Sequence, residues 1–344
     1  MTFLNDKRFL TYILYSVSVA FTFVFIDTFY QFLHFDLIKG YGPDILGYYS
    51  NDHFRLTGPF RSNIPGAYLS KFFFIVFLFT IVKLKKSKND SLLFVPLVTL
   101  GFFLVFLTGE AMSFASIGLG LLILFLLEKK FRKKIIFSLI VLFCLIFLAV
   151  KFNPIWNKIE IVEKNPWHNG TVYQINFPCK NNKNEICKQK FETQPFFYEV
   201  LTNFSKSAYG ETYGQAITIW KDHPLFGIGI KNYTNVCKSE KYKESLKYFF
   251  CTTHPHNFYI QWLLETGVLG LLGFITLLFI WFKYFTKDIN KNTDPLVYAP
   301  ILTLFVLFWP FMSTGSFFSN RNATMNWFII AICLSITNLR NKKV

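Results

Sequence analysis

Several sequence patterns that would point to common functions are missing from this chain. No C-x-x-C pair occurs, and no cluster of His, Asp and Glu outside the apolar runs has the spacing of metal ligands. We therefore expect neither a metal nor a cofactor. No internal repeat is evident, which argues against a transporter built from inverted repeats. No long Pro- or Ser-rich tract marks a free linker.

Long apolar runs dominate the sequence instead. Hydrophobic residues make up 52% of the 344 positions, and 45 residues are Phe. A spanning helix needs ~20 mostly apolar residues to cross ~30 Å of hydrocarbon, where no backbone group can stay unpaired. The stretch 91–127 allows either two spans or one long interrupted helix. The runs predict an all-α integral membrane protein with about eight transmembrane helices, at 10–31, 67–84, 91–108, 112–127, 134–151, 257–282, 297–313 and 323–338.

The net charge of +16 suggests a nucleic-acid partner, but the distribution of the charge argues against one. Basic clusters follow every second predicted span, as the positive-inside rule requires, so both termini are expected in the cytoplasm. Contact with membrane lipid headgroups is a minor further role. The first run is too long for a signal-peptide core and lacks an A-x-A cleavage site, so we expect it to stay in the mature chain. The clusters begin at Lys7, Lys83, Lys129, Lys283 and Arg340.

This topology places three segments outside the cytoplasm, at 32–66, 152–256 and 314–322. The middle segment is far too long to be a simple connector. Residues with helical spacing around Gln215, followed by a turn at 222–229, favour a small packed cap with short helices. We therefore predict a single polytopic membrane domain over 1–344, with 152–256 as its external cap. The alternative is that this segment only covers the membrane part.

Four cysteines on the predicted external segment suit an oxidising compartment. They allow three connectivities. Neighbour pairing closes the shortest loops, so we favour Cys179 with Cys187 and Cys237 with Cys251. Zinc binding is the alternative, but the spacings lack the usual knuckle. The other two cysteines, Cys144 and Cys333, lie inside apolar runs and are expected to face lipid or the core.

The sharpest local signal is the run from Thr253 to Asn257, with His254 and His256 just before the sixth predicted span. Asn257 is a good N-cap, and the positive end of a helix dipole disfavours a charged imidazole beside it. A neutral His256 can act as a general base, although a His at a helix start is also often a wetted interfacial residue. Glu265 lies deeper in the same run, where an ionisable group is a functional candidate or pairs with another helix.

Arginines are few, and their positions are informative. Of six in the chain, Arg55, Arg61 and Arg321 fall on predicted external segments close to span ends. A guanidinium binds phosphate in a bidentate way that lysine cannot match. Three such arginines and a neutral histidine at one membrane face suit a lipid-linked diphosphate substrate. Each arginine taken singly could equally be a solvated surface charge.

These residues resemble the O-antigen ligase / O-antigen polymerase family of bacterial polysaccharide assembly. The likeness rests on the run from Trp220 to Gly229, on Cys237, and on the run from Cys251 to Gly267, which is similar to the family's "h-P-L-x-G-x-G … H-x-H-N-x-Y-L-x-x-x-x-E-x-G" signature. Supporting segments are Asp27 to Gln31, Arg55 to Phe60 and Ser313 to Asn320.

The resemblance implies a multi-pass protein of the bacterial inner membrane that joins sugar chains on the periplasmic face. The donor would be an undecaprenyl-diphosphate-linked glycan, the acceptor a glycan or lipid, and a chain-length regulator a possible partner. Transfer would be inverting and independent of metal. His256 is the matching histidine, with His254 as the second candidate. Glu265 is the third candidate, although on one straight helix it would face the side opposite His256 and not touch it. The diphosphate-binding residues would be Arg55, Arg61 and Arg321, with Lys221 and Lys231 adding charge near the donor.

Two departures from the family pattern stand out. Relatives often carry an arginine at the turn where this chain has Gly109-Glu110-Ala111, so Arg61 or Arg321 would have to substitute. Relatives also commonly have more spans, which implies that several N-terminal helices are absent here. Ligase and polymerase share their chemistry and are not separated by this sequence. A non-catalytic scaffold that binds glycan and a lipid-linked oligosaccharide flippase are the alternatives from other classes.

Overall fold

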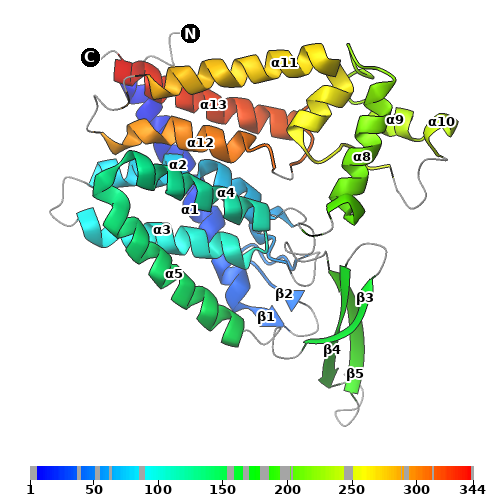
Figure 1. Ribbon diagram of the computed structural model, residues 1–344. Coiled ribbons are helices and arrows are strands. Elements are labelled where there is room, and N and C mark those ends of the chain that lie inside the picture. The colour runs from blue at the N-terminus through cyan, green and yellow to red at the C-terminus, as the bar shows by residue number, and fades with distance from the viewer. Residues whose placement is uncertain are drawn as a thin grey trace. The chain divides into compact units, whose positions relative to one another are not determined.

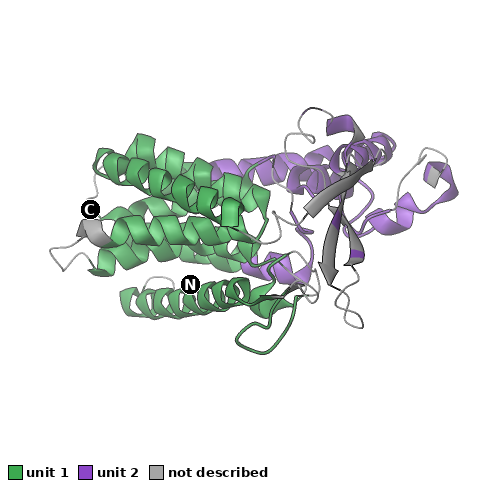
Figure 2. Cartoon of the chain, turned by 90° about the horizontal axis from the view of Figure 1, so that it is seen from below, with its two compact units in different colours: residues 1–152, 281–309, 326–344 green, residues 153–280, 310–325 purple. Residues whose placement is uncertain are grey.

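The structure is a computed structural model of the 344-residue chain. It divides into two compact units, coloured separately in Figure 2. Unit 1 comprises residues 1–152, 281–309 and 326–344, and unit 2 comprises residues 153–280 and 310–325. The structure describes residues 6–36, 40–50, 55–61, 64–84, 90–152, 159–165, 170–178, 186–193, 202, 204–243, 251–287, 289, 294–311 and 314–341.

Unit 1 is a bundle of apolar helices (Figure 1). Helix α2 packs against four others and is buried on nearly all sides, with Phe72, Phe73 and Phe74 in its core. Helix α5 is the opposite case, because most of its apolar side chains are exposed. A continuous exposed apolar surface of this size is stable only against lipid. The helices are α1 (Lys7–Leu33), α2 (Pro65–Leu84), α3 (Asp90–Leu107), α4 (Ala111–Leu127), α5 (Arg132–Phe152), α12 (Ala299–Phe308) and most of α13 (Asn320–Asn341).

Short elements connect these helices. A two-stranded antiparallel ribbon of β1 (Phe35–Asp36) and β2 (Gly40–Tyr41) follows α1. Single 3₁₀ turns lie at η2 (Gly58–Phe60), η3 (Lys129–Phe131) and η6 (Pro295–Tyr298). The Asp294 carboxylate caps η6 by accepting from the Leu296 N–H at 3.0 Å, so the chain enters α12 in a fixed direction.

Unit 2 contains an antiparallel sheet and a small helical core. The sheet has the order β3 (Ile159–Asn165), β4 (Gly170–Pro178) and β5 (Ile186–Thr193). After the 3₁₀ turn η4 (Phe204–Lys206) come the helices α8 (Ala208–Lys221), α9 (Tyr233–Cys237), α10 (Glu240–Lys243) and the first part of α11 (Phe258–Thr286). Side chains from α8, α9, α10 and α11 form one buried cluster, namely Ala216, Ile219, Tyr233, Cys237, Tyr242 and Leu264.

A helix lies in each predicted span, although α12 ends at Phe308, before the predicted end at 313. Five described helices are long and apolar enough to cross a membrane: α1, α2, α5 with its preceding turn, α11 and α13. The remaining three apolar helices, α3, α4 and α12, are shorter. The uncertain stretch 91–127 forms two helices that turn at residues 108–110, where Gly109 adopts φ 71°. The chain is thus a multi-pass membrane protein, and the count of eight spans stays a prediction.

The predicted cap differs from expectation in one respect. Its short helices are present as α8, α9 and α10, but the sheet β3–β5 was not predicted, so the all-α fold class is incomplete. Unit 1 reaches Phe152, where the cap was predicted to begin, whereas unit 2 continues beyond the predicted end at 256 into α11.

Candidate functional site

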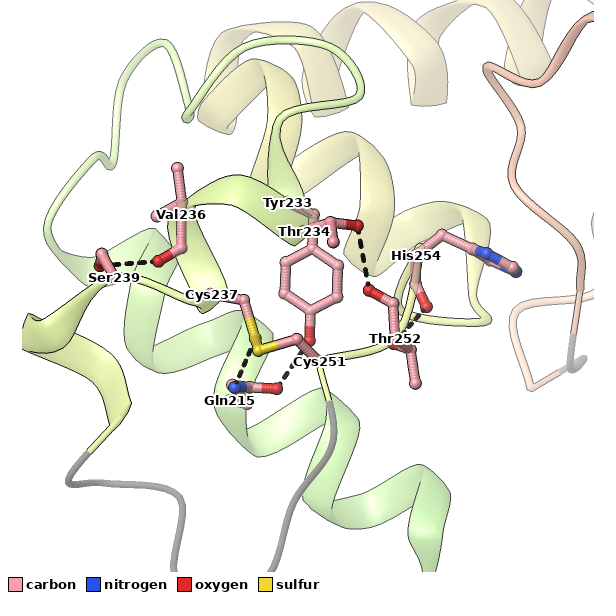
Figure 3. Close-up of a disulfide and its surroundings, with 9 residues drawn as sticks. All are labelled: Gln215, Tyr233, Thr234, Val236, Cys237, Ser239, Cys251, Thr252 and His254. Carbon is pink, nitrogen blue, oxygen red and sulfur yellow. Dashed lines mark hydrogen bonds between the residues drawn. A yellow bond between two sulfur atoms is a disulfide. The ribbon is translucent and has the colours of Figure 1, made fainter.

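The loop of residues 251–257, here called the histidine loop, is fixed at its first residue by a disulfide between Cys251 and Cys237 (Figure 3). This is one of the two predicted pairs. Cys179 lies outside the described residues, so the second pair, with Cys187, stays a prediction. The disulfide joins the histidine loop to the end of α9, in the buried cluster of unit 2.

Hydrogen bonds around the disulfide hold the loop further. The Gln215 side chain donates from Nε2 to the Cys237 sulfur at 2.9 Å and accepts from the Tyr233 hydroxyl at 2.8 Å. The Thr234 hydroxyl donates to the Thr252 carbonyl at 3.3 Å. Figure 3 shows that His254 points away from this arrangement. The loop is therefore anchored on one side, and its imidazoles lie on the other.

The last residue of the loop, Asn257, caps α11 as the sequence predicts. Its side-chain oxygen accepts from the N–H groups of Tyr259 at 2.9 Å and Ile260 at 3.2 Å. Its Nδ2 donates to the Pro310 carbonyl at 2.6 Å. The preceding residue, His256, adopts φ 56°, and its carbonyl accepts from the Thr314 N–H at 2.8 Å. Such a backbone costs on the order of 1 kcal/mol or more for a non-glycine residue.

The two imidazoles lie against each other, with ring centroids 4.2 Å apart. His254 is held at both nitrogens, because Nδ1 lies 2.9 Å from the Thr253 hydroxyl and Nε2 lies 3.2 Å from the Thr314 carbonyl. Since a carbonyl only accepts, Nε2 carries the proton. Burial lowers the pKa of His254 to about 4, with the neighbouring His256 acting in the same direction. His254 is therefore neutral near pH 7 and committed to positioning.

Burial also lowers the pKa of His256 below its ordinary value of 6.5, while the backbone of Thr314 partly opposes this. The dipole of the following helix predicts a neutral His256, and in the structure burial is the main cause of the lowered pKa. Tyr209 of α8 meets the His256 ring edge-on, with centroids 6.2 Å apart. Burial raises the pKa of Tyr213, one turn further along α8, to about 12. The described ring neighbours of His256 are thus Tyr209 and His254.

The signature run 224–229 forms a backbone joint with α11, which is broken at Gly267 (φ 69°). The N–H groups of Ile228 and Gly229 donate to the carbonyls of Leu264 and Glu265, both at 3.0 Å. In return, the Val268 N–H donates to the Pro224 carbonyl at 2.9 Å. The loop thereby satisfies the backbone groups that the break leaves unpaired.

Two glycines make this joint sterically possible. A Cβ on Gly227 would lie 2.5 Å from the Glu265 carbonyl carbon, and one on Gly267 would lie 2.1 Å from the Leu225 carbonyl oxygen. Both residues also have positive φ, which glycine adopts without strain. The two halves of the sequence signature, around Gly227 and around Gly267, are therefore the two surfaces of one contact.

The Glu265 side chain completes the joint. One carboxylate oxygen accepts from the Lys231 backbone N–H at 2.7 Å, and the other accepts from Gln261 Nε2 at 3.0 Å. Gln261 in turn donates to the Ser316 hydroxyl and accepts from the Phe317 N–H, both at 2.8 Å. Glu265 is almost fully buried. Its carboxylate links the signature loop to the segment that carries Thr314 and does not face open solvent.

Among the described residues, three that are not glycine have positive φ, and each was predicted as a site residue: Arg61, Lys231 and His256. Left-handed backbone at such residues tends to occur where function requires it. At Lys231 the backbone N–H makes the contact with Glu265, while the side chain is exposed. Lys221, at the end of α8, is also exposed. Arg321 is exposed in the first turn of α13 and belongs to unit 2 with the histidines.

Arg55 and Arg61 belong to unit 1, on a loop at residues 55–61 that we call the arginine loop. This loop is held by Gln31 of α1, whose side-chain oxygen accepts from the N–H groups of Thr57 and Gly58, both at 2.9 Å. Two of the three supporting segments thus contact each other. Arg61 is exposed and stacks on the Tyr48 ring, with 3.5 Å between the guanidinium carbon and the ring centroid.

Glu110 occupies the turn at which the family resemblance predicts an arginine. Burial raises the pKa of its carboxyl, and the positive charge of Arg55 lowers it in part. Unit 1 therefore brings Arg55 and Glu110 within electrostatic range of each other. Within the described parts of the chain, no group of three His, Cys, Asp or Glu side chains could hold a metal ion.

A model of the O-antigen ligase family matches residues 96–275, just over half of the chain. The chain belongs to the O-antigen ligase family. The match includes the joint, the histidine loop and Glu265, and it leaves Arg55, Arg61 and Arg321 outside. A search of curated proteins finds no match.

Sequence reasoning did not single out Thr314 or Gln261, although both lie in or beside segments that carry the resemblance to O-antigen ligases. Thr314 contacts the histidine loop through both its N–H and its carbonyl. Gln261 lies one turn before Glu265 on α11, and a polar residue so close to a buried carboxylate was the available signal.

Proposed function

We propose that this O-antigen ligase family member is a membrane glycosyltransferase that transfers or polymerises glycan from a polyprenyl-diphosphate-linked donor on the non-cytoplasmic face. The observation that carries the proposal is His256, a buried and neutral imidazole on strained backbone within the family signature. An imidazole of this kind accepts a proton near neutral pH. The disulfide that fixes its loop supports an oxidising compartment.

The proposed reaction is a single inverting displacement. His256 takes the proton from an acceptor hydroxyl as that oxygen forms a bond to the anomeric carbon of the donor sugar. The bond between the anomeric carbon and the diphosphate breaks, and the diphosphate leaves with the electron pair. The guanidinium groups of Arg55, Arg61 and Arg321 stabilise the charge on the departing diphosphate, with Lys221 and Lys231 adding positive charge. The proton on His256 is then released to solvent or to the diphosphate.

Two residues predicted as catalytic take positioning roles in this proposal. His254 has both ring nitrogens engaged by Thr253 and Thr314, so it holds His256 in place and does not accept a proton. Glu265 has both carboxylate oxygens engaged by Lys231 and Gln261, so it fixes the joint.

The test is His256→Ala, assayed by glycan chain length in a deletion strain and by consumption of the lipid-linked donor in membranes. Loss of a general base costs roughly 10²–10⁴-fold in rate, so we expect no polymer or ligated product. His223→Ala is the matched control, because His223 is exposed on the turn after α8 and should leave transfer unchanged. Product of normal length and amount from His256→Ala, with both variants equally inserted in the membrane, would refute the assignment.

A further inference from the structure

The break in α11 changes where the membrane boundary lies on this helix. The part after Gly267, residues 268–286, is about 19 residues or about 28 Å long at 1.5 Å per residue. The hydrocarbon core is about 30 Å thick, so this part alone crosses it. The part before the break, with Glu265 and the histidine loop in front of it, then lies outside the hydrocarbon. The apolar run 257–282 predicts Glu265 inside the span, whereas the break places it outside the hydrocarbon.

The joint fixes the signature loop at the level of this break, because Pro224 and Leu225 accept hydrogen bonds from Val268 and Leu269 of α11. Three large apolar side chains of the loop are nevertheless exposed: Leu225 by 58%, Phe226 by 74% and Ile230 by 58%. Leu269 and Leu272 of α11 are similarly exposed. The exposed side chains of the loop therefore continue the lipid-facing surface of the spanning helix.

The positive charge on either side of the loop also points to lipid as its neighbour. Lys221 and Lys231 flank the three apolar side chains in sequence, and both are exposed. Apolar residues bordered by lysines are typical of segments that lie in the interface, where the ammonium groups meet anionic headgroups. Large apolar side chains exposed on one loop point to contact with lipid or with a partner.

We propose that the loop of residues 224–230 inserts Leu225, Phe226 and Ile230 into the boundary between headgroups and acyl chains, with Lys221 and Lys231 at the anionic headgroups. The occupant of this surface is the lipid bilayer itself. The insertion sets the height of the histidine loop above the membrane, because α11 is hydrogen-bonded to the inserted loop and begins where the histidine loop ends. This inference shares Lys221 and Lys231 with the proposed reaction, but its test measures contact with lipid and not glycan transfer.

The test uses spin labels on the full-length protein in nanodiscs that contain anionic lipid. Single cysteines replace Phe226 and, separately, Ile230, in a background where Cys144, Cys179 and Cys187 are serine. Cys237 and Cys251 are kept, and their bond is checked on non-reducing gels. Leu272→Cys serves as the lipid-exposed reference and Lys238→Cys as the aqueous one. Ile217→Cys, at an exposed apolar position on α8, is the matched control. The readout is collision with oxygen, which partitions into lipid, against a water-soluble nickel chelate.

We expect labels at 226 and 230 to behave like the label at 272, with several-fold lower collision with nickel than at 238, and the label at 217 to behave like that at 238. Labels at 226 and 230 that collide with nickel as freely as at 238 would overturn the proposal. Protection from both oxygen and nickel would also overturn it, because the patch would then be covered by protein, such as a partner or a second copy of the chain.

Discussion

The histidine loop and the arginine loop are held in place by different kinds of contact. Each holds a predicted site residue in left-handed backbone, His256 at φ 56° and Arg61 at φ 57°. The histidine loop is fixed by the disulfide to Cys237 at one end and by the Asn257 cap of α11 at the other. The arginine loop has no covalent anchor among its described contacts and is held by hydrogen bonds, chiefly to the buried Gln31 side chain and from the Ser50 hydroxyl to the Arg55 carbonyl.

This difference indicates which side chain must be positioned more accurately in the proposed reaction. In the proposed reaction a general base must keep a fixed distance to the atom it deprotonates, and a loop anchored by a disulfide at one end and by a helix cap at the other provides this. Arginines that neutralise a diphosphate need the correct fork geometry, but long side chains can adjust to the ligand. We therefore expect the histidine loop to be sensitive to its scaffold and the arginine loop to the identity of the arginine side chain.

The largest loss of transfer rate that would separate the two loops is expected when an arginine is replaced by lysine. Lysine keeps the charge that faces Glu110 but loses the bidentate fork, so at least one of Arg55→Lys, Arg61→Lys and Arg321→Lys should be nearly as damaging as the change to alanine. Losing one preorganised charge-stabilising contact costs ~10²–10³-fold in rate. We expect this first at Arg55, which is half-buried. Donor turnover in membranes is the measurement, and full activity of all three lysine variants would contradict the clamp.

The next effect concerns the disulfide. Replacing both Cys237 and Cys251 by serine should cost ~3 kcal/mol in the chain-entropy model for a loop of about 15 residues. The loss should be confined to unit 2, so hydrogen exchange should rise in α9 and residues 251–257 and stay unchanged in α2. The matched control is Cys144→Ser, an exposed free cysteine on α5. Finding both residues as free thiols in protein from an oxidising compartment would disprove the bond.

A smaller effect is expected from Gln31→Leu, which tests the dependence of the arginine loop on one side chain. The change leaves the N–H groups of Thr57 and Gly58 without their acceptor, and an unsatisfied buried group costs ~1–3 kcal/mol. We expect faster proteolysis at residues 55–61 with the histidine loop unaffected. Ser16→Ala on the exposed face of the same helix is the control. Equal protease resistance of Gln31→Leu and Ser16→Ala would mean that other contacts hold the loop.

The smallest expected effect is a difference in pH dependence between the two regions. The pKa of His254 is lowered to about 4, so between pH 6.5 and 4 the unfolded chain binds a proton that the folded chain does not, and stability falls as pH falls. The pKa of Glu110 is raised, so its region gains stability as pH falls toward that pKa. Hydrogen exchange at pH 7 and 5, corrected for intrinsic rates, should move in opposite directions at 251–257 and 108–114. Identical pH responses in His254→Asn and the parent chain would contradict the histidine part.

Much of the fold could be predicted from the sequence, because spanning helices need apolar runs of a fixed length. The sheet β3–β5 was missed, although Tyr173, Ile175 and Phe177 alternate with Gln174 and Asn176 in the pattern of a strand. The break at Gly267 was also missed, since hydropathy reads 257–282 as one uninterrupted run. The role of Glu265 could not be predicted, because its partner is the backbone N–H of Lys231 and no residue type encodes such a contact.

The backbone joint has a consequence for anyone who wishes to exchange parts between members of this family. Because residues 224–229 and 264–269 are bonded to each other through their main chains, neither half can be transplanted alone without leaving the other half of the joint unmatched. A chimaera that alters acceptor choice should therefore carry both halves, together with the disulfide between them, in one cassette. Suitable crossover points lie in the turn before α8, at residues 204–207, and beyond Leu269 in the regular part of α11.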